Sequence, residues 1–223
     1  MSIAENLKSI ESGLNDQTTL VAVSKTHPVK LIREAYDAGQ RDFGENKVQE
    51  LCDKQPQLPE DIRWHLIGHL QTNKVKYIAP FVHLIHAVDS LRLLSEINKR
   101  AANCNRVIGC LLQIHIAKEE TKFGLSEEEA LSLLSDQALD DMAHVSIKGL
   151  MGMATFTNDE DQVAREFNGL KQFYDTLKTA VNHKIWQPEI LSMGMSGDYL
   201  IAQANGSTMV RVGSAIFGNR NYH

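Results

Sequence analysis

The feature that most constrains the fold is a repeated alternation of short, β-rich apolar runs with longer segments of helical periodicity. The strand-like runs occupy residues 20–25, 41–45, 63–68, 83–88, 106–116, 145–151, 189–194 and 208–213. Parallel neighbours in a sheet must be joined by crossover connections, which are usually helices. The alternation therefore predicts an α/β fold with a parallel sheet.

The segments between these runs carry helix signals. Ser2 and Glu5 form a capping box, and Ser126 with Glu129 forms another. The clearest helical periodicity joins Val163, Phe167, Leu170, Tyr174, Leu177 and Val181. The helix that begins after Ser2 precedes the first strand, so we expect an extra helix at the N-terminus.

The length of the chain narrows the architecture further. Its 223 residues give strand–helix units of roughly 28 residues, close to the roughly 30 of a compact βαβ unit. No Pro-, Gly- or Ser-rich linker interrupts them. We predict a single domain over residues 1–223, a (β/α)8 barrel of the TIM type, with an open doubly wound sheet as the alternative.

Composition and charge exclude several functional classes. Hydrophobic residues make up 43% of the chain, enough for a packed core, which excludes a disordered protein. The 23 basic and 28 acidic residues give a net charge of −5, which argues against nucleic acid or an anionic membrane as the partner. The three cysteines form no Cys-x-x-Cys pair, and neither a leader nor a membrane span is evident. We expect a cytoplasmic protein.

Lys25 stands where the first apolar strand ends, and active sites of parallel barrels lie at the carboxyl ends of strands. It can be an ordinary solvated lysine of the barrel rim. Alternatively, a partly apolar surrounding disfavours its charged form, lowers its pKa and frees the amine to attack a carbonyl. The functional interpretation is a lysine that forms a Schiff base.

The last two strand ends are rich in small residues. Ser196 precedes a predicted helix, and Gly213 with Ser214 follows the eighth strand. Barrels of this kind bind phosphate at the loops after the seventh and eighth strands, next to a helix N-terminus. Turn glycines and an N-cap serine would look the same in isolation. Because the first and eighth strands are neighbours in a closed barrel, the lysine and this cradle together suit a phosphorylated aldehyde, either pyridoxal phosphate or a sugar phosphate in an aldolase.

Five separated motifs carry a resemblance to a known family. They are Ala22-Val23-Ser24-Lys25, Phe43-Gly44-Glu45-Asn46 with Val48-Gln49-Glu50, Trp64 to Gln71 with Asn73-Lys74, Ser192-Met193-Gly194-Met195-Ser196, and Val210-Arg211-Val212-Gly213 with Ile216-Phe217-Gly218. The chain resembles the pyridoxal phosphate homeostasis protein family, of the YggS/PROSC type, from the first strand to the last.

The resemblance implies an alanine-racemase-like barrel, of fold type III, with pyridoxal 5′-phosphate (PLP) as its cofactor. Lys25 would form the internal aldimine, Ser196, Gly213 and Ser214 would hold the phosphate, and Arg211 would face the pyridine ring or the phosphate. Asn46 and Met193 match positions that line the same pocket, and Lys122 and Gly124 match a further family stretch. Departures from the family pattern occur at Ala87, Gly197 and Gly152-Met153-Ala154.

The family role implies a carrier and regulator of PLP and amino-acid pools, with no catalytic residues and little or no turnover. An arginine beside the pyridine nitrogen weakens the cofactor as an electron sink, and the chain leaves no room for the β-rich second domain of the racemases. We expect a monomer that passes PLP to PLP-dependent apoenzymes. The alternatives are a PLP-dependent amino-acid racemase and a Schiff-base aldolase.

Histidines offer a weaker alternative site. His65 and His69 are predicted to share one face of a strand, where they can be metal ligands. No third ligand stands at a suggestive spacing, so we interpret them as core or pocket histidines and expect no metal. The pair His83 and His86 falls on opposite faces and is a weaker candidate still.

Overall fold

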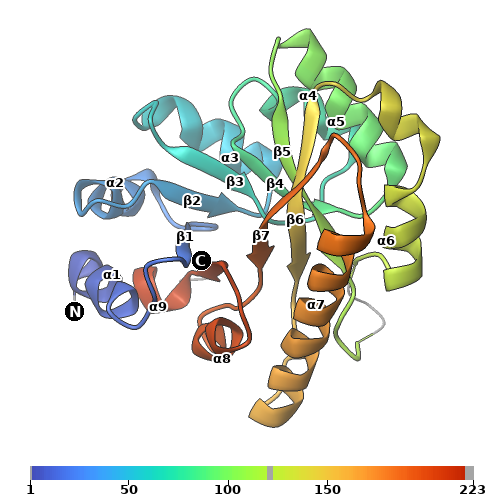
Figure 1. Cartoon of the computed structure of the whole chain (residues 1–223). Coiled ribbons are helices and arrows are strands. Elements are labelled where there is room, and N and C mark those ends of the chain that lie inside the picture. Colours follow the sequence, from blue (N-terminus) through green and yellow to red (C-terminus); the bar gives the residue numbers. More distant parts are fainter. Residues whose placement is uncertain (1, 120–122, 219–223) are drawn as a thin grey trace.

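The strands of the computed structural model, which describes residues 2–119 and 123–218, form a closed parallel barrel in the order of the sequence. β8 closes the barrel by pairing with β1, with Val21 opposite Arg211. The predicted (β/α)8 barrel is confirmed (Figure 1). Within the described residues the strands are β1 Thr19–Val23, β2 Asp42–Glu45, β3 Arg63–Leu66, β4 Leu84–Val88, β5 Ile108–Ile114, β6 Val145–Gly152, β7 Trp186–Ser192 and β8 Met209–Val212.

Helices surround the outer face of the barrel and alternate with the strands (Figure 1). Both predicted capping boxes are present, at Ser2 with Glu5 and at Ser126 with Glu129. The helices of the described ranges are α1 Ile3–Glu11, α2 Val29–Asp37, α3 Val48–Lys54, α4 Val75–Ile78, α5 Leu91–Asn103, α6 Glu127–Leu134, α7 Glu160–Ala180, α8 Tyr199–Ala204 and α9 Ser214–Phe217, with 3-10 helices η1 Gln55–Gln57, η2 Thr72–Lys74 and η3 Gln137–Asp141.

The extra N-terminal helix α1 is present and packs against the last helix. Asn6 Nδ2 donates a hydrogen bond of 2.9 Å to the carbonyl of Ile216 in α9. Leu7 and Ile10 are the buried residues of α1. The two ends of the described chain therefore lie side by side. Over these same ranges, no helix combines the length and the apolar character needed to cross a membrane.

β7 begins earlier than the predicted 189–194 segment, because an irregularity accommodates a proline. Ile147 pairs with Trp186 and Gly149 with Ile190, so the register shifts between the two pairs. Pro188 lies within the shifted stretch, where its missing N–H is tolerated. Gly149 has φ +140°, and a Cβ there would lie 1.9 Å from the carbonyl oxygen of Ile190. The β6–β7 contact therefore requires glycine at this position.

The apolar core has two parts, separated by the strands. Leu20 and Ala22 belong to the large cluster that also contains the helix residues, whereas Val21 belongs to a small separate cluster. Successive side chains of a strand point to opposite faces, so the small cluster fills the barrel interior. Its buried members are Val21, Leu84, Ala87, Leu111, Met151 and Met209.

Candidate functional site

A cavity of about 730 Å³ opens at the C-terminal end of the barrel. The loops that follow β1, β2, β6, β7 and β8 all contribute to its wall. This is the end at which barrels of this class place their sites. Except for Met193, all of the predicted cofactor-binding residues line it: Lys25, Asn46, Ser196, Arg211, Gly213 and Ser214.

Met193 is not among the residues that line this cavity. Its side chain is fully buried in the large core cluster. β7 ends at Ser192, and Gly194 turns the chain with φ +96°. The Met193 side chain therefore points into the packing around the barrel while its neighbours in the motif reach the cavity.

Lys25 lies in a tight turn immediately after β1. Ser24 Oγ on one side donates to Glu45 Oε1 at 2.6 Å, and the Thr26 N–H on the other side donates to Glu50 Oε1 at 2.5 Å. Thr26 has φ +66°, a conformation that is costly for a β-branched residue. Two carboxylates thus accept hydrogen bonds from the residues on both sides of the lysine.

Those two carboxylates share one buried ammonium group. Lys54 Nζ lies 2.7 Å from Glu45 Oε1, 2.7 Å from Glu50 Oε1 and 2.8 Å from the carbonyl of Ser24. Glu45 is fully buried. Burial raises the pKa of its carboxyl, and the Lys54 charge acts in the opposite direction. We call Glu45, Glu50 and Lys54 the Lys54 cluster; it fixes the turn that carries Lys25.

Sequence reasoning missed this cluster, although one signal was present. Glu50 and Lys54 are four residues apart on α3, a spacing that pairs opposite charges on a helix. Glu45 gives no comparable signal, because a carboxylate at a strand end can equally well face solvent. Only the closure of the barrel places it under the turn at Ser24.

The residues predicted to hold phosphate are brought together. The Gly213 N–H donates to Ser196 Oγ at 3.1 Å, and Ser214 begins α9 directly afterwards. A Cβ on Gly213 would lie 3.1 Å from the carbonyl oxygen of Val23 in β1, so glycine allows the close approach of the two chain segments. The first N–H groups of a helix have no acceptor within it and suit an anion.

Arg211 is buried on β8 and reaches the cavity wall from inside the barrel. Its Nη1 donates to Ser192 Oγ at 2.7 Å, and its Nη2 donates to the carbonyl of Gly152 at 3.0 Å. Burial lowers the pKa of Arg211 to about 10, and the carboxylate of Asp198 opposes this shift. The guanidinium therefore stays charged at neutral pH.

The departures from the family pattern have distinct surroundings. A Cβ on Gly152 would lie 2.6 Å from Leu170 Cδ2, so glycine fits the space under α7 while its carbonyl holds Arg211. Ala87 packs inside the barrel. Gly197 lies on the cavity rim, where a Cβ would meet open space.

The predicted histidine pair on β3 is not formed. His65 is buried in the strand, but β3 ends at Leu66, so His69 lies in the following loop. There its Nδ1 lies 3.3 Å from Asp89 Oδ2, and its ring stacks on Phe123 at 4.3 Å between centroids. Across residues 2–119 and 123–218, no group of three His, Cys, Asp or Glu side chains is arranged to hold a metal ion.

Of the further family stretch, Lys122 lies outside the described residues. Gly124 is described and has φ +141°, where a Cβ would come within 2.6 Å of the backbone nitrogen of His115. The loop after β5 thus requires glycine for its own backbone. Gly124 is not among the residues that line the cavity.

Comparisons with known proteins agree on one family. The family model of the alanine racemase N-terminal domain matches residues 1–221. The chain is 41% identical over 204 residues to the pyridoxal phosphate homeostasis protein of Aquifex aeolicus (strain VF5), covering 91% of this chain and 87% of that one. The solved structure of PipY from Synechococcus elongatus PCC7942 with PLP bound is 37% identical, with a TM-score of 0.88 over 97% of this chain and 100% of that chain. Alanine racemase from Bartonella henselae, at 18% identity and a TM-score of 0.74, shares the fold over 98% of this chain and 58% of its own.

Proposed function

The chain belongs to the pyridoxal phosphate homeostasis protein family, and on that premise we propose that it binds PLP in the cavity at the C-terminal end of the barrel. The observation that carries this proposal is the pairing of the first strand with the last. Lys25 follows β1, Gly213 follows β8, and β1 pairs with β8. A primary amine and the N-terminus of α9 therefore line one cavity.

The residues present fit this cofactor. Lys25 supplies the amine for an imine with the aldehyde, and Ser196, Gly213 and Ser214 supply hydroxyl and N–H donors for the phosphate. Arg211, which reaches the cavity from the barrel interior, would face the pyridine ring or the phosphate. Asn46 lines the wall contributed by the end of β2. The cavity is within the range of roughly 300–1,000 Å³ usual for small-molecule sites.

We propose that the protein carries and regulates PLP and does not turn over amino acids. A charged arginine facing the pyridine nitrogen disfavours protonation there and so weakens the electron sink that carbanion chemistry needs. In this role the protein is a single-domain monomer in the cytoplasm that delivers PLP to PLP-dependent apoenzymes. A racemase using the same imine and a Schiff-base aldolase are the competing functions.

Borohydride reduction tests the binding proposal. PLP added to the purified protein is expected to give an absorbing imine that borohydride removes, and peptide mapping is expected to place the reduced adduct on Lys25. Lys25→Ala is expected to lose the imine and keep the fold, whereas Lys74→Ala, which alters an exposed lysine, keeps it. An adduct on Lys74 or Lys122 in the unaltered protein would place the cofactor elsewhere.

Deuterium exchange at the α-carbon of alanine and other amino acids tests the carrier role. The loaded protein is expected to show traces of exchange at most, because the arginine weakens the electron sink and a carrier needs no positioned acid and base groups. Such groups contribute about 10²–10⁴-fold each. NMR of the amino acids measures the exchange. Turnover near the ordinary enzyme range of about 1 s⁻¹ or more would favour the racemase.

A further inference from the structure

The hydrogen bonds of Arg211 continue away from the cavity through the barrel interior. Ser192 Oγ lies 3.1 Å from His86 Nδ1, and His86 Nε2 lies 2.9 Å from His65 Nδ1. His65 Nε2 then lies 3.0 Å from Asp42 Oδ1. We call this series the Arg211–Asp42 chain. Ser192, His86 and His65 are fully buried in the barrel, which also holds the small apolar cluster around Val21.

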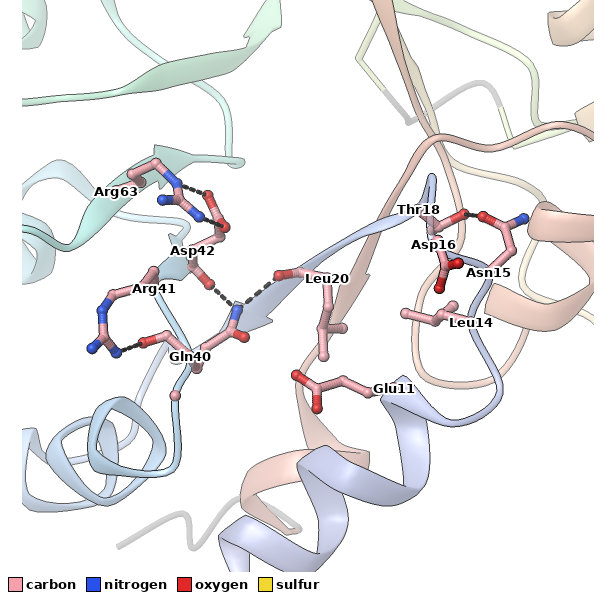
Figure 2. Close-up of a pocket in the computed structure, with 11 residues that line it drawn as sticks. Glu11, Leu14, Asn15, Asp16, Thr18, Leu20, Gln40, Arg41, Asp42 and Arg63 are labelled. Carbon is pink, nitrogen blue, oxygen red and sulfur yellow. Dashed lines mark hydrogen bonds and ion pairs between the residues drawn. The ribbon is translucent and has the colours of Figure 1, made fainter.

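The Arg211–Asp42 chain runs from one end of the barrel to the other. Arg211 lines the cavity at the C-terminal end, whereas Asp42 is the first residue of β2. Asp42 lines two cavities of about 300 and 280 Å³ at the N-terminal end. Figure 2 shows the first of these, with Asp42 joined to Arg63 and with Gln40 between the carbonyls of Leu20 and Asp42.

The chemistry of its two ends fixes the direction of the hydrogen bonds. A guanidinium only donates, so Ser192 Oγ accepts from Arg211. An ionised carboxylate only accepts, so His65 Nε2 carries a proton toward Asp42. With both histidines neutral, His65 Nδ1 accepts from His86 Nε2–H and His86 Nδ1 accepts from Ser192 O–H. Every donor then points away from the cavity, and each bond of the series is made.

The reverse order does not fit the same contacts. If His86 donated through Nδ1 to Ser192, its Nε2 would have to accept from His65 Nδ1. His65 would then need protons on both nitrogens, and the Ser192 hydroxyl proton would have no acceptor in the chain. A buried donor without an acceptor is costly. The one-way order with neutral histidines satisfies all the groups.

The charge at the far end supports this order. Burial raises the pKa of Asp42, but hydrogen bonds from His65 and Arg63 outweigh it and lower the pKa to about 2. Arg63 Nε donates to Asp42 Oδ1 at 2.7 Å, and Arg63 Nη2 pairs with Oδ2. The chain therefore ends in a carboxylate that is ionised over the physiological range.

We propose that Ser192, His86 and His65 are positioning residues for Arg211, and that the Arg211–Asp42 chain holds its guanidinium against the cofactor in one orientation. The proposal rests on the proposed PLP site. A second proton on either histidine would set donor against donor and turn the series away from Arg211. The orientation of the charged group that would meet the cofactor ring thus depends on residues at the opposite end of the barrel.

Burial and neighbouring charges keep His86 neutral. His65 faces Asp42 on β2, Arg63 on its own strand, and His83 and His86 from the segment of β4. His86 faces His65, His83 and Arg211 of β8. Burial, together with His65, Arg211 and His83, lowers its pKa well below the ordinary value.

Nitrogen-15 NMR of the histidine rings tests the chain without any cofactor. At pH 7 the protein free of PLP is expected to show His65 and His86 as neutral rings, each protonated at Nε2 only. His65→Gln and His86→Gln assign the signals. Protonation of either ring at Nδ1 would overturn the proposal. Because no PLP is present, this result does not depend on the proposed function.

PLP titrations of variants test the positioning role. His86→Leu removes both bonds of residue 86 and is expected to weaken PLP binding roughly tenfold, as for loss of support to a charged group, and to shift the pH profile of the bound cofactor's absorbance. His86→Gln keeps an acceptor and a donor and is expected to restore both properties. His83→Gln is the control, because His83 is an exposed neighbour of His65 that takes no part in the Arg211–Asp42 chain.

Two further outcomes are decisive. Equal affinity and equal pH profiles for His86→Leu and the unaltered protein would overturn the positioning role. If His86→Leu does not fold, Ser192→Ala, which removes only the hydroxyl that joins Arg211 to His86, is expected to give the same loss. Failure of the unaltered protein to bind PLP would refute the proposed function. The ring-nitrogen spectra would still show whether the hydrogen bonds of the Arg211–Asp42 chain run in the proposed direction.

Discussion

Lys54 shows how one side chain can organise the turn that carries Lys25. Its ammonium group compensates the buried carboxylate of Glu45 and also holds Glu50, which accepts the N–H of Thr26. The unfavourable φ of Thr26 persists because these bonds determine it from outside the turn. The conformation of Lys25 is therefore set by residues that do not line the cavity.

Lys54→Met is expected to destabilise the protein by about 3–5 kcal/mol, because it leaves the Glu45 carboxylate buried without its counter-charge. Urea denaturation measures the loss. The double variant Lys54→Met with Glu45→Gln is expected to regain part of it, since the buried charge is then gone. Lys47→Met, at an exposed lysine just before α3, is the control and should change stability little.

Ser196→Ala is expected to weaken PLP binding while leaving the binding of pyridoxal, which lacks phosphate, nearly unchanged. One hydrogen bond to a charged group is worth about 1.5–3 kcal/mol, or roughly ten- to a hundredfold in affinity. Absorbance titrations with both aldehydes measure this. Ser135→Ala, after α6, is the control; equal losses for the two aldehydes in Ser196→Ala would move the phosphate to another site.

At the level of elements, the β6–β7 pair aligns the two groups that accept hydrogen bonds from Arg211. Gly152 ends β6 and Ser192 ends β7, and the shifted register at Pro188 sets how these ends face each other. The shift depends on Gly149, where the two backbones approach most closely. Strand pairing, and not only local loop structure, thus places the arginine.

Gly149→Ala is expected to destabilise the fold by more than about 2 kcal/mol, because the new Cβ meets backbone at a positive φ. Gly169→Ala is the matched control: it lies in α7 with nothing within 4 Å of a Cβ, and helix propensity predicts a gain of roughly 0.5–1 kcal/mol. Thermal and urea unfolding measure both. Similar effects at the two glycines would contradict the assigned contact.

The strands were predictable because apolar runs of this length, separated by helical periodicity, suit only a parallel sheet. The first helix and the capping box at Ser126 followed from local spacing in the same way. The start of β7 and the place of His69 were not predictable, since each depends on where a neighbouring strand stops pairing. The contacts of Glu45 with Ser24 and of His86 with Ser192 form only when the barrel closes, and spacing along the sequence contains no information on them.

For the molecule as a whole, the buried histidine gives stability a defined pH dependence. The pKa of His86 is lowered in the folded state from an ordinary value of 6.5. Below pH 6.5 the unfolded chain binds a proton at this residue and the folded protein does not, so stability falls as the pH falls. One such proton corresponds to about 1.4 kcal/mol per pH unit.

Urea denaturation between pH 7.5 and 5 is expected to show this loss, and His86→Gln is expected to reduce the slope by roughly one proton. Asp42, whose pKa is lowered from 3.8 to about 2, contributes a separate loss only as the pH falls below about 4. Equal slopes for His86→Gln and the unaltered protein between pH 6.5 and 5 would contradict a neutral buried His86.

The pairing of the first and last strands also has a consequence for biosynthesis. Lys25 is made early and Gly213 almost last, yet the proposed cofactor site needs both. A nascent chain still lacking β8 would lack the proposed phosphate site and could not withdraw PLP from the cell. In the closed barrel a ligand bound as proposed would link the two strands, and at a hundred times its dissociation constant it would add about 2.7 kcal/mol to stability. Loading would thus act as a quality check, marking only those molecules whose synthesis and folding are complete.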